Sequence, residues 1–310
     1  MVGKNDIDVQ ITEVGPRDGL QNAHGVMATA AKKAWITAEA AAGVPEIEVC
    51  SFVPPKLIKG MEDAAEIVGH ANAIKGLGVV ALVPNRRGAA DALAAGAGKI
   101  SIPVSVSESH SRSNVRKSRD EMIEEVAAIR ALCDASPDKI TIEVGLSTAF
   151  GCSMEGRVAE SEVVRMAVAS VAAGADDVSL ADTVGYADPA LVKRVYLATA
   201  AEIGDHLAGI HLHNTMGLGL ANAMAALEAG ARAFDSSLGG LGGCPFAPGA
   251  SGNIVTEDLV FMLESQGMRT GIDIEALVAV REIVAAGLPD DAIYGHVGTS
   301  GLPTGWAPSA

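Results

Sequence analysis

The sequence predicts a (β/α)8 barrel with a C-terminal helical and irregular extension. A pattern of strand, polar turn and helix repeats eight times, and helices repeatedly end at glycine. The length of 310 residues suits a barrel of this kind folded as one domain. An open doubly wound sheet is the alternative, but no GxGxxG motif follows the first strand. We assign residues 1–310 to one domain, with the barrel at about 7–270 and the extension at 271–310.

The predicted strands are short runs rich in valine and isoleucine, which parallel sheets bury on both faces. They lie at residues 7–14, 45–50, 79–83, 99–106, 139–146, 176–181, 208–214 and 231–238. Alanine-rich helices follow most of them, for example at 30–43, 119–133 and 161–174. A last helix is predicted at 274–287, and we interpret the glycine- and proline-rich tail behind it as irregular or frayed.

Charge and composition narrow the class of protein. The formal net charge of -15 argues against nucleic acid or an anionic membrane as the main partner. No apolar run approaches the roughly 20 residues of a membrane span, and the N-terminus lacks the apolar stretch of a signal peptide. The four cysteines, Cys50, Cys133, Cys152 and Cys244, form no CxxC pair. We expect free thiols and a cytoplasmic location.

Active sites of such barrels form at the carboxyl ends of the strands. Polar residues gather at these ends in this sequence. They are Glu13, Arg17, Asp18 and Gln21 after strand one, Glu46 and Glu48 on strand two, Asp182 after strand six, His211, His213 and Asn214 on strand seven, and Cys244 and Asn253 after strand eight.

The stretch GIHLHNTMG carries two histidines two residues apart. Residues i and i+2 of a strand face the same side, about 6.6 Å apart, so both imidazoles can reach one ion. Hydrogen-bonded core histidines are the alternative. Asp18 and Asn253 favour the metal, because strands one, seven and eight adjoin in a closed barrel. Two imidazoles, a carboxylate and an amide suit a divalent Lewis acid with positions open for substrate.

Other polar residues allow two interpretations each. Arg17 is either a surface ion-pair partner or a cation placed to hold an enolate or carboxylate oxygen, and Glu48 is its expected partner. Asp182 either orients a histidine or binds substrate, or it caps a helix in competition with Thr183. Cys244 lies in GGLGGCPFAPGASGN, where a thiol can be a proton donor or nucleophile, or where the glycines serve tight turns alone.

The basic run SHSRSNVRKSR at residues 109–119 is interpreted as a solvated helix start, with a phosphate-binding patch as the alternative. The histidines outside the His-x-His pair are interpreted as surface or structural residues. They are His24, His70, His110, His206 and His296.

Taken together, these residues resemble the hydroxymethylglutaryl-CoA lyase family, a group of metal-dependent lyase barrels. The resemblance runs to about residue 287. The stretches that carry it are EVGPRDGLQN, EVCSFVPPK, GLGVVALVPNRRG, SLADTVGYADP, HLHNTMGLGLANAMAALEAG and DSSLGGLGGCPFAPGASGNIVTEDLVFMLESQG.

The resemblance implies roles for the site residues. Asp18, His211, His213 and Asn253 bind Mg²⁺ or Mn²⁺, Arg17 stabilises the enolate, and Cys244 is the catalytic thiol. Gln21, Glu48 and Asp182 support or contact substrate. We name Asp18 or His211, directly or through water, as the base that takes the hydroxyl proton.

The implied reaction is cleavage of 3-hydroxy-3-methylglutaryl-CoA to acetyl-CoA and acetoacetate, a step of leucine degradation, in a homodimer or homotetramer. Two departures from the family leave the acyl group open: the loop SVSESHSRSNVRKS lacks the usual aromatic residue, and the tail lacks a cysteine. The alternatives are a lyase for another branched 3-hydroxyacyl-CoA such as citramalyl-CoA, an aldolase of free oxo-acids, and a non-catalytic scaffold.

Overall fold

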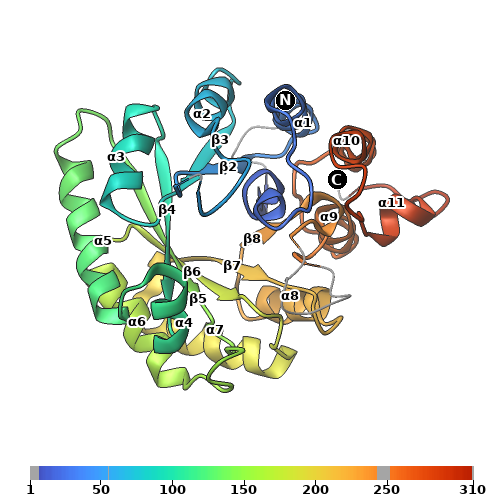
Figure 1. The fold of residues 1–310 in the computed structure, drawn as a ribbon. Helices are drawn as coiled ribbons and strands as arrows, with labels where there is room; N and C mark the ends of the chain where they lie inside the picture. The colour runs from blue at the N-terminus through green and yellow to red at the C-terminus, as the bar shows by residue number, and fades with distance from the viewer. Residues whose placement is uncertain (1–6, 55, 243–251, 309–310) are drawn as a thin grey trace.

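The strands form a closed, all-parallel barrel whose order follows the chain, with β1 paired to β8 (Figure 1). This computed structural model describes residues 7–54, 56–242 and 252–308. The strands are β1 (Gln10–Glu13), β2 (Glu46–Ser51), β3 (Gly78–Leu82), β4 (Lys99–Ser105), β5 (Thr141–Ser147), β6 (Asp177–Asp182), β7 (Leu207–Leu212) and β8 (Ala233–Ser236). The predicted fold class is confirmed.

Helices alternate with the strands and surround them as an outer layer in Figure 1. They are α1 (Thr29–Ala41), α2 (Ala64–Asn72), α3 (Arg86–Ala94), α4 (Glu108–Val115), α5 (Arg119–Asp134), α6 (Glu160–Ala172), α7 (Pro189–Ile203), α8 (Gly219–Glu228), α9 (Thr256–Ser265), α10 (Ile274–Gly287) and α11 (His296–Ser300). The short helix α4 is an addition between β4 and α5. Helices α10 and α11 form the extension, and α10 packs beside α1 (Figure 1).

Three features of the structure differ from the sequence prediction: the ends of two strands near the site and the regularity of the tail. The strand predicted at 7–14 ends at Glu13, because the chain turns into a π-helical segment at Gly15–Gly19. The strand predicted at 208–214 ends at Leu212, because His213 forms a bridge with Asn253 instead. The tail is less irregular than predicted, since α11 forms there and Asp258 accepts hydrogen bonds from its first two amides.

The two faces of the strands have different surroundings. In β4, Ile100, Ile102 and Val104 are fully buried, and they alternate with residues that face the barrel interior. One of these, Lys99, places its Nζ 2.9 Å from carboxylate oxygens of both Glu46 and Glu143. The barrel interior around Lys99 is therefore polar. It contains a cavity of about 300 Å³, and Asp235 is one of the residues that line this cavity.

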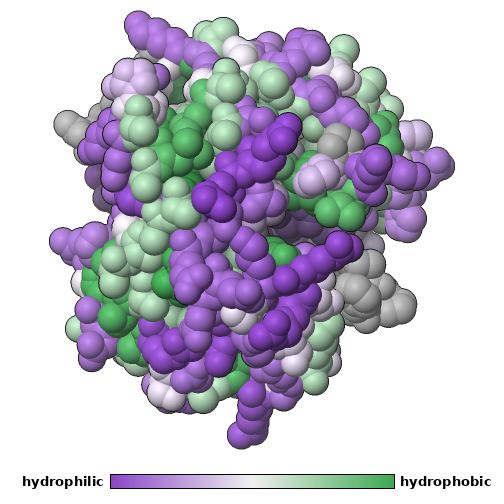
Figure 2. Space-filling model, turned by 60° about the vertical axis from the view of Figure 1, so that its left-hand side comes forward, coloured by the Kyte–Doolittle hydropathy of each residue, from purple (hydrophilic) through white to green (hydrophobic). Residues whose placement is uncertain are grey.

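The helices bury one apolar stripe each. In α6, the residues Val163, Met166, Ala167 and Ser170 are buried at the spacing of a single helix face. Figure 2 shows hydrophilic side chains predominating over the middle of one face of the molecule, with hydrophobic ones in smaller groups. In the described ranges, no helix combines the length and the apolar character needed to span a bilayer.

Candidate active site

Three side chains from two segments converge at the carboxyl end of the barrel. They are Asp18, His211 and His213, and one ligand atom of each lies within 4.8 Å of the others. The two Nε2 atoms of the histidines are 3.0 Å apart, and Nε2 of His213 is 3.7 Å from Oδ2 of Asp18. The His-x-His spacing thus does bring both imidazoles to one point, as predicted from the strand period.

The segment Gly15–Gly19 places Asp18 there. Its π-helical turn is closed by the carbonyl of Val14, which accepts from the amides of Arg17, Asp18 and Gly19 at 3.1, 2.7 and 3.3 Å. Gly15 is required, since a Cβ at this position would lie 2.5 Å from a carboxylate oxygen of Glu13. The sequence GPRDG therefore presents Arg17 and Asp18 side by side above β1.

Asn253 completes the group from the far side of β8. Its Nδ2 donates to Oδ2 of Asp18 at 2.7 Å and to the carbonyl of Leu241 at 3.0 Å. These two acceptors assign the amide orientation, and they leave Oδ1 buried with no hydrogen-bond partner among the described residues. Amide oxygens are suitable ligands for divalent ions, so Asn253 can complete a donor set with the carboxylate and the two imidazoles.

The distances fit one shared divalent ion. In an octahedral site with ligands about 2.1 Å from the ion, neighbouring ligand atoms are about 3.0 Å apart, which is 2.1 Å times the square root of two. The two histidine nitrogens show this separation. An Nε2–H···Nε2 hydrogen bond between the two rings has the same separation, so the pair fits a site with or without an ion.

A second carboxylate fixes the ring of His211. Oδ2 of Asp235, on β8, lies 3.1 Å from Nδ1 of His211. Burial alone would lower the pKa of His211, but the hydrogen bond and charge of Asp235 outweigh it and raise that pKa. Metal-bound histidines commonly have such a carboxylate partner. Sequence analysis missed Asp235, although strand alternation in ARAFDSSL places it on the interior face.

Arg17 is held between two carboxylates. It forms ion pairs with Asp18 and with Glu48, and Glu48 also accepts from the hydroxyl of Ser101. Burial would lower the pKa of Arg17, but the charges of Glu48 and Asp18 hold it above its usual range. Burial would raise the pKa of Asp18, but Arg17 and the histidines hold it well below its usual range. The predicted pairing of Arg17 with Glu48 is therefore confirmed.

The pKa of Glu48 is shifted in the opposite direction to that of Asp18. Burial raises its pKa, and the charge of Arg17 only partly offsets this effect. The Arg17 guanidinium thus remains a full positive charge at the barrel mouth while its two carboxylate partners differ in proton affinity. Such a cation can stabilise negative charge that develops on a bound oxygen.

The remaining predicted site residues have different outcomes. Asp182 is fully buried, and its two oxygens accept from the amides of Tyr186 and Ala187 at 2.9 and 3.1 Å. This arrangement holds the loop after β6, and the contact of Asp182 with substrate stays a prediction. Asp182 is not a helix cap, because Asp188 caps α7. Gln21 is half-buried just behind the π-helical turn, and Cys244 lies outside the described residues.

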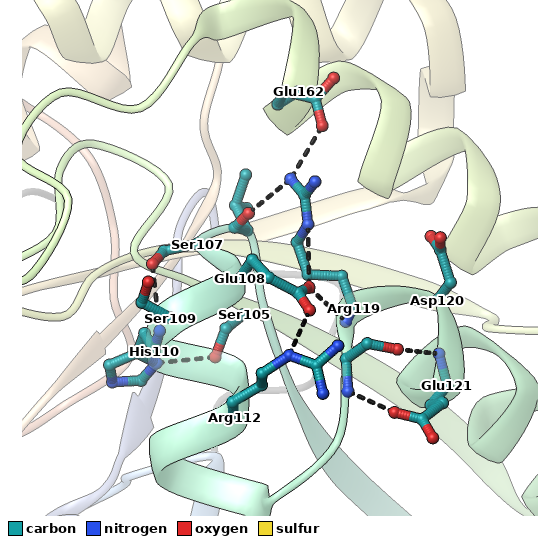
Figure 3. Close-up of polar contacts among 12 residues, drawn as sticks. Ser105, Ser107, Glu108, Ser109, His110, Arg112, Arg119, Asp120, Glu121 and Glu162 are labelled. Carbon is teal, nitrogen blue, oxygen red and sulfur yellow. Dashed lines mark hydrogen bonds and ion pairs between the residues drawn. The ribbon is translucent and has the colours of Figure 1, made fainter.

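The basic run at 109–119 is largely neutralised by acidic neighbours. Figure 3 shows Arg112 paired with Glu108, and Arg119 reaching Glu108 and Glu162. Lys117 pairs with Glu125. In the same view, Nδ1 of His110 lies 2.7 Å from the hydroxyl of Ser105. The geometry favours the interpretation as a helix start over a phosphate-binding patch.

Comparison with known proteins adds independent information. The profile of the HMGL-like family matches residues 8–284. The hydroxymethylglutaryl-CoA lyase YngG of Bacillus subtilis is 41% identical over 271 residues, which cover 87% of this chain and 90% of that protein. The mitochondrial hydroxymethylglutaryl-CoA lyase of Mus musculus is 38% identical over 280 residues, covering 90% and 86%.

A solved structure of an HMG-CoA lyase is also similar to this chain. An HMG-CoA lyase from Acinetobacter baumannii, in complex with coenzyme A and 3-methylmalate, superimposes with a TM-score of 0.89 at 37% identity. The match covers 99% of each chain. The similarity therefore includes the whole barrel and the extension.

Proposed function

This chain belongs to the HMGL-like family, and on that premise we propose that it is a hydroxymethylglutaryl-CoA lyase. It cleaves the carbon–carbon bond of 3-hydroxy-3-methylglutaryl-CoA and releases acetyl-CoA and acetoacetate. Its substrate is an acyl-CoA, as the coenzyme A bound to the A. baumannii relative supports.

One observation carries the proposal: a triad of ligand atoms within 4.8 Å, beside an orphaned amide oxygen and a buried arginine. The donor set of Asp18, His211, His213 and Asn253 supports a divalent metal. We propose Mg²⁺ or Mn²⁺, because carboxylate and amide oxygens suit these ions and Mn²⁺ also accepts imidazole. When bound, the ion would polarise the substrate oxygens and lower the pKa of the 3-hydroxyl.

The residues of the chain then divide the chemistry. A base takes the 3-hydroxyl proton, the C2–C3 bond breaks, and its electron pair passes to the thioester as an enolate while acetoacetate forms. Arg17 stabilises the enolate oxygen with a charge that no accessible pH removes. Cys244, proposed from sequence alone, then delivers a proton to the enolate carbon.

The proposed base is Asp18 or His211, acting directly or through a water molecule. Both nitrogens of His211 have neighbours, Asp235 and His213. The carboxylate of Asp18 is engaged by Arg17 and Asn253. These contacts hold both groups in place, and a water that hydrogen-bonds to either one can carry the proton from the substrate hydroxyl.

We further propose a homodimer or homotetramer, a cytoplasmic location and a place in leucine degradation. Cys50, Cys133 and Cys152 are free, which suits a reducing compartment. Light scattering coupled to size-exclusion chromatography measures the oligomer directly.

The experiment that tests the function measures acetyl-CoA release from 3-hydroxy-3-methylglutaryl-CoA, with Mg²⁺ or Mn²⁺ and after chelation. Citramalyl-CoA and free 3-hydroxy-3-methylglutarate are run in parallel. Metal-dependent turnover of the first substrate supports the proposal. A preference for citramalyl-CoA would keep the reaction type and change the acyl group, and turnover of the free acid would favour the CoA-independent aldolase.

A further inference from the structure

A carboxylate behind the active site connects three separate segments of the chain. Glu13, the last residue of β1, has no exposed surface. It accepts hydrogen bonds from the amide of Gly15 at 2.7 Å, the amide of Leu238 at 2.9 Å and the hydroxyl of Thr256 at 2.7 Å. One side chain thereby joins the end of β1, the turn after β8 and the start of α9.

Those segments are the ones that carry ligand residues. Gly15 opens the π-helical turn that presents Asp18, and Thr256 follows Asn253 by three residues. A shift of either segment moves a donor atom relative to the histidines. In the described part of the chain, Glu13 has no hydrogen bond to any of the ligand side chains, so its influence passes through the backbone.

A second buried carboxylate holds the same turn from the other side. Oε2 of Glu257, on α9, accepts from the amide of Gly239 at 3.0 Å. Its other oxygen pairs with Arg281 of α10, which also donates to the carbonyl of Tyr294 at 2.6 Å. The amide of Tyr294 donates back to the carbonyl of Gly239 at 2.7 Å.

The turn held in this way decides how Asn253 is oriented. Gly239 and Gly240 have φ values of +63° and +65°, a left-handed conformation that other residues rarely adopt. This places the carbonyl of Leu241 where it accepts from Nδ2 of Asn253 at 3.0 Å. With Nδ2 fixed there, Oδ1 is the amide atom that has no hydrogen-bond partner among the described residues and can act as a ligand.

We propose that Glu13 and Glu257 are positioning residues that align Asp18 and Asn253 for metal binding, and that Arg281 makes the C-terminal extension part of this support. The inference rests on the proposed metal-dependent function. Stability alone is a poor reason for two fully buried carboxylates, because apolar residues of similar size would avoid the desolvation penalty. A network in which the oxygens accept from fixed backbone donors instead specifies one geometry.

The test is Mn²⁺ affinity, measured by electron paramagnetic resonance of the free ion on the full-length protein. We expect Glu13→Ala and Glu257→Ala to weaken Mn²⁺ binding about 10- to 100-fold, the range for residues that support metal ligands. Glu13→Gln keeps an acceptor for the backbone amides, so its affinity should stay within about threefold of wild type. Arg281→Met should weaken Mn²⁺ binding about tenfold. Because Arg281 lies in the C-terminal extension, this variant still tests the network if Glu13→Ala or Glu257→Ala fails to fold.

The control is Glu264→Ala, at the far end of α9. Glu264 is also buried, and its carboxylate accepts from the amide and hydroxyl of Thr270 at 2.6 and 2.7 Å. We expect Glu264→Ala to lower the unfolding temperature and leave Mn²⁺ affinity unchanged.

The outcomes separate this inference from the proposed function. If wild type binds no Mn²⁺, the metal-dependent function fails and the inference fails with it. If wild type binds Mn²⁺ and Glu13→Ala and Glu257→Ala bind it equally well, only the inference is overturned. It is also overturned if Glu264→Ala loses as much affinity, because general destabilisation would then explain the effect.

Discussion

The contact between Asp235 and His211 leads to a quantitative prediction for metal binding. Oδ2 of Asp235 is 3.1 Å from Nδ1 of His211, and the interaction orients the ring so that Nε2 points at Asp18 and His213. Replacing Asp235 by alanine removes the acceptor, whereas asparagine keeps an oxygen and removes only the charge. The two variants therefore separate orientation from electrostatics.

The expected loss of Mn²⁺ affinity depends on how far Asp235 and His211 are exposed to solvent. Partners of metal-bound histidines contribute about 10- to 100-fold in affinity, or about 1.4–2.7 kcal/mol. The side chain of Asp235 is 24% exposed, so solvent screens its charge and the lower part of this range applies. We expect Asp235→Asn to weaken Mn²⁺ binding about tenfold and Asp235→Ala about 30-fold.

The pH dependence of Mn²⁺ binding gives a second prediction for Asp235→Asn, in which the variant is less sensitive to acid than wild type. Asp235 raises the pKa of His211 although burial opposes this, and a protonated imidazole cannot bind a metal. Wild-type Mn²⁺ binding should therefore weaken as pH falls through the pKa of His211. In Asp235→Asn that pKa falls, so the acid limb moves to lower pH while affinity at high pH is reduced. The two binding curves should converge as pH decreases.

The assay is an Mn²⁺ titration of each variant from about pH 5.5 to 8.5. Asp177→Asn is the matched control, because Asp177 lines the same interior cavity as Asp235 and has no hydrogen bond to a histidine within the described residues. Mn²⁺ affinity of Asp235→Ala within twofold of wild type at high pH would refute the reasoning. An equal loss in Asp177→Asn would also refute it, since the effect would then come from cavity charge.

Three further predictions follow from the site and the barrel wall. Arg17→Met should reduce turnover of 3-hydroxy-3-methylglutaryl-CoA about 10²- to 10³-fold in steady-state assays, because the enolate loses its cation; unchanged turnover would exclude that role. Cys244→Ala should lose orders of magnitude in turnover while Mn²⁺ affinity stays constant, and retained turnover would remove the thiol from the mechanism. Burial raises the pKa of Glu13 from 4.5 to about 8, so the folded protein keeps a proton that the unfolded chain releases. Its contribution to stability is complete below the unfolded pKa and is lost as pH rises toward about 8, by about 1.4 kcal/mol per pH unit. Urea unfolding of the metal-free protein should show this slope, and Glu13→Gln should flatten it; an identical slope in both proteins would contradict the assignment.

Much of the fold and part of the site can be predicted from the sequence, because they depend on local periodicity. Alternating β-branched runs and glycine-terminated helices repeat along the chain, and α10 begins and ends where its pattern predicts. The strand period also predicts the common direction of His211 and His213, and the bridge to Asn253 holds His213 in that direction beyond the end of β7. The pairing of Arg17 with Glu48 could be expected because β1 and β2 are neighbours in any such barrel.

Other features depend on closure of the barrel and on turns that no local pattern describes. Sequence spacing does not reveal the hydrogen bond of Asp235 to His211, across 24 positions, or that of Thr256 to Glu13, across 243. The pairing of β7 with β8 places His211 beside Asp235, and the pairing of β1 with β8 closes the barrel and brings the segment after β8 to Glu13. Asp182 ends its strand as a catalytic residue would, yet the amides of its own loop take both of its oxygens. The sequence by itself thus determined which types of ligand side chain are present. The tertiary structure decided which carboxylates face the proposed metal site and which hold its backbone in place. The reason is that only the closed sheet brings hydrogen-bond donors to each buried carboxylate oxygen.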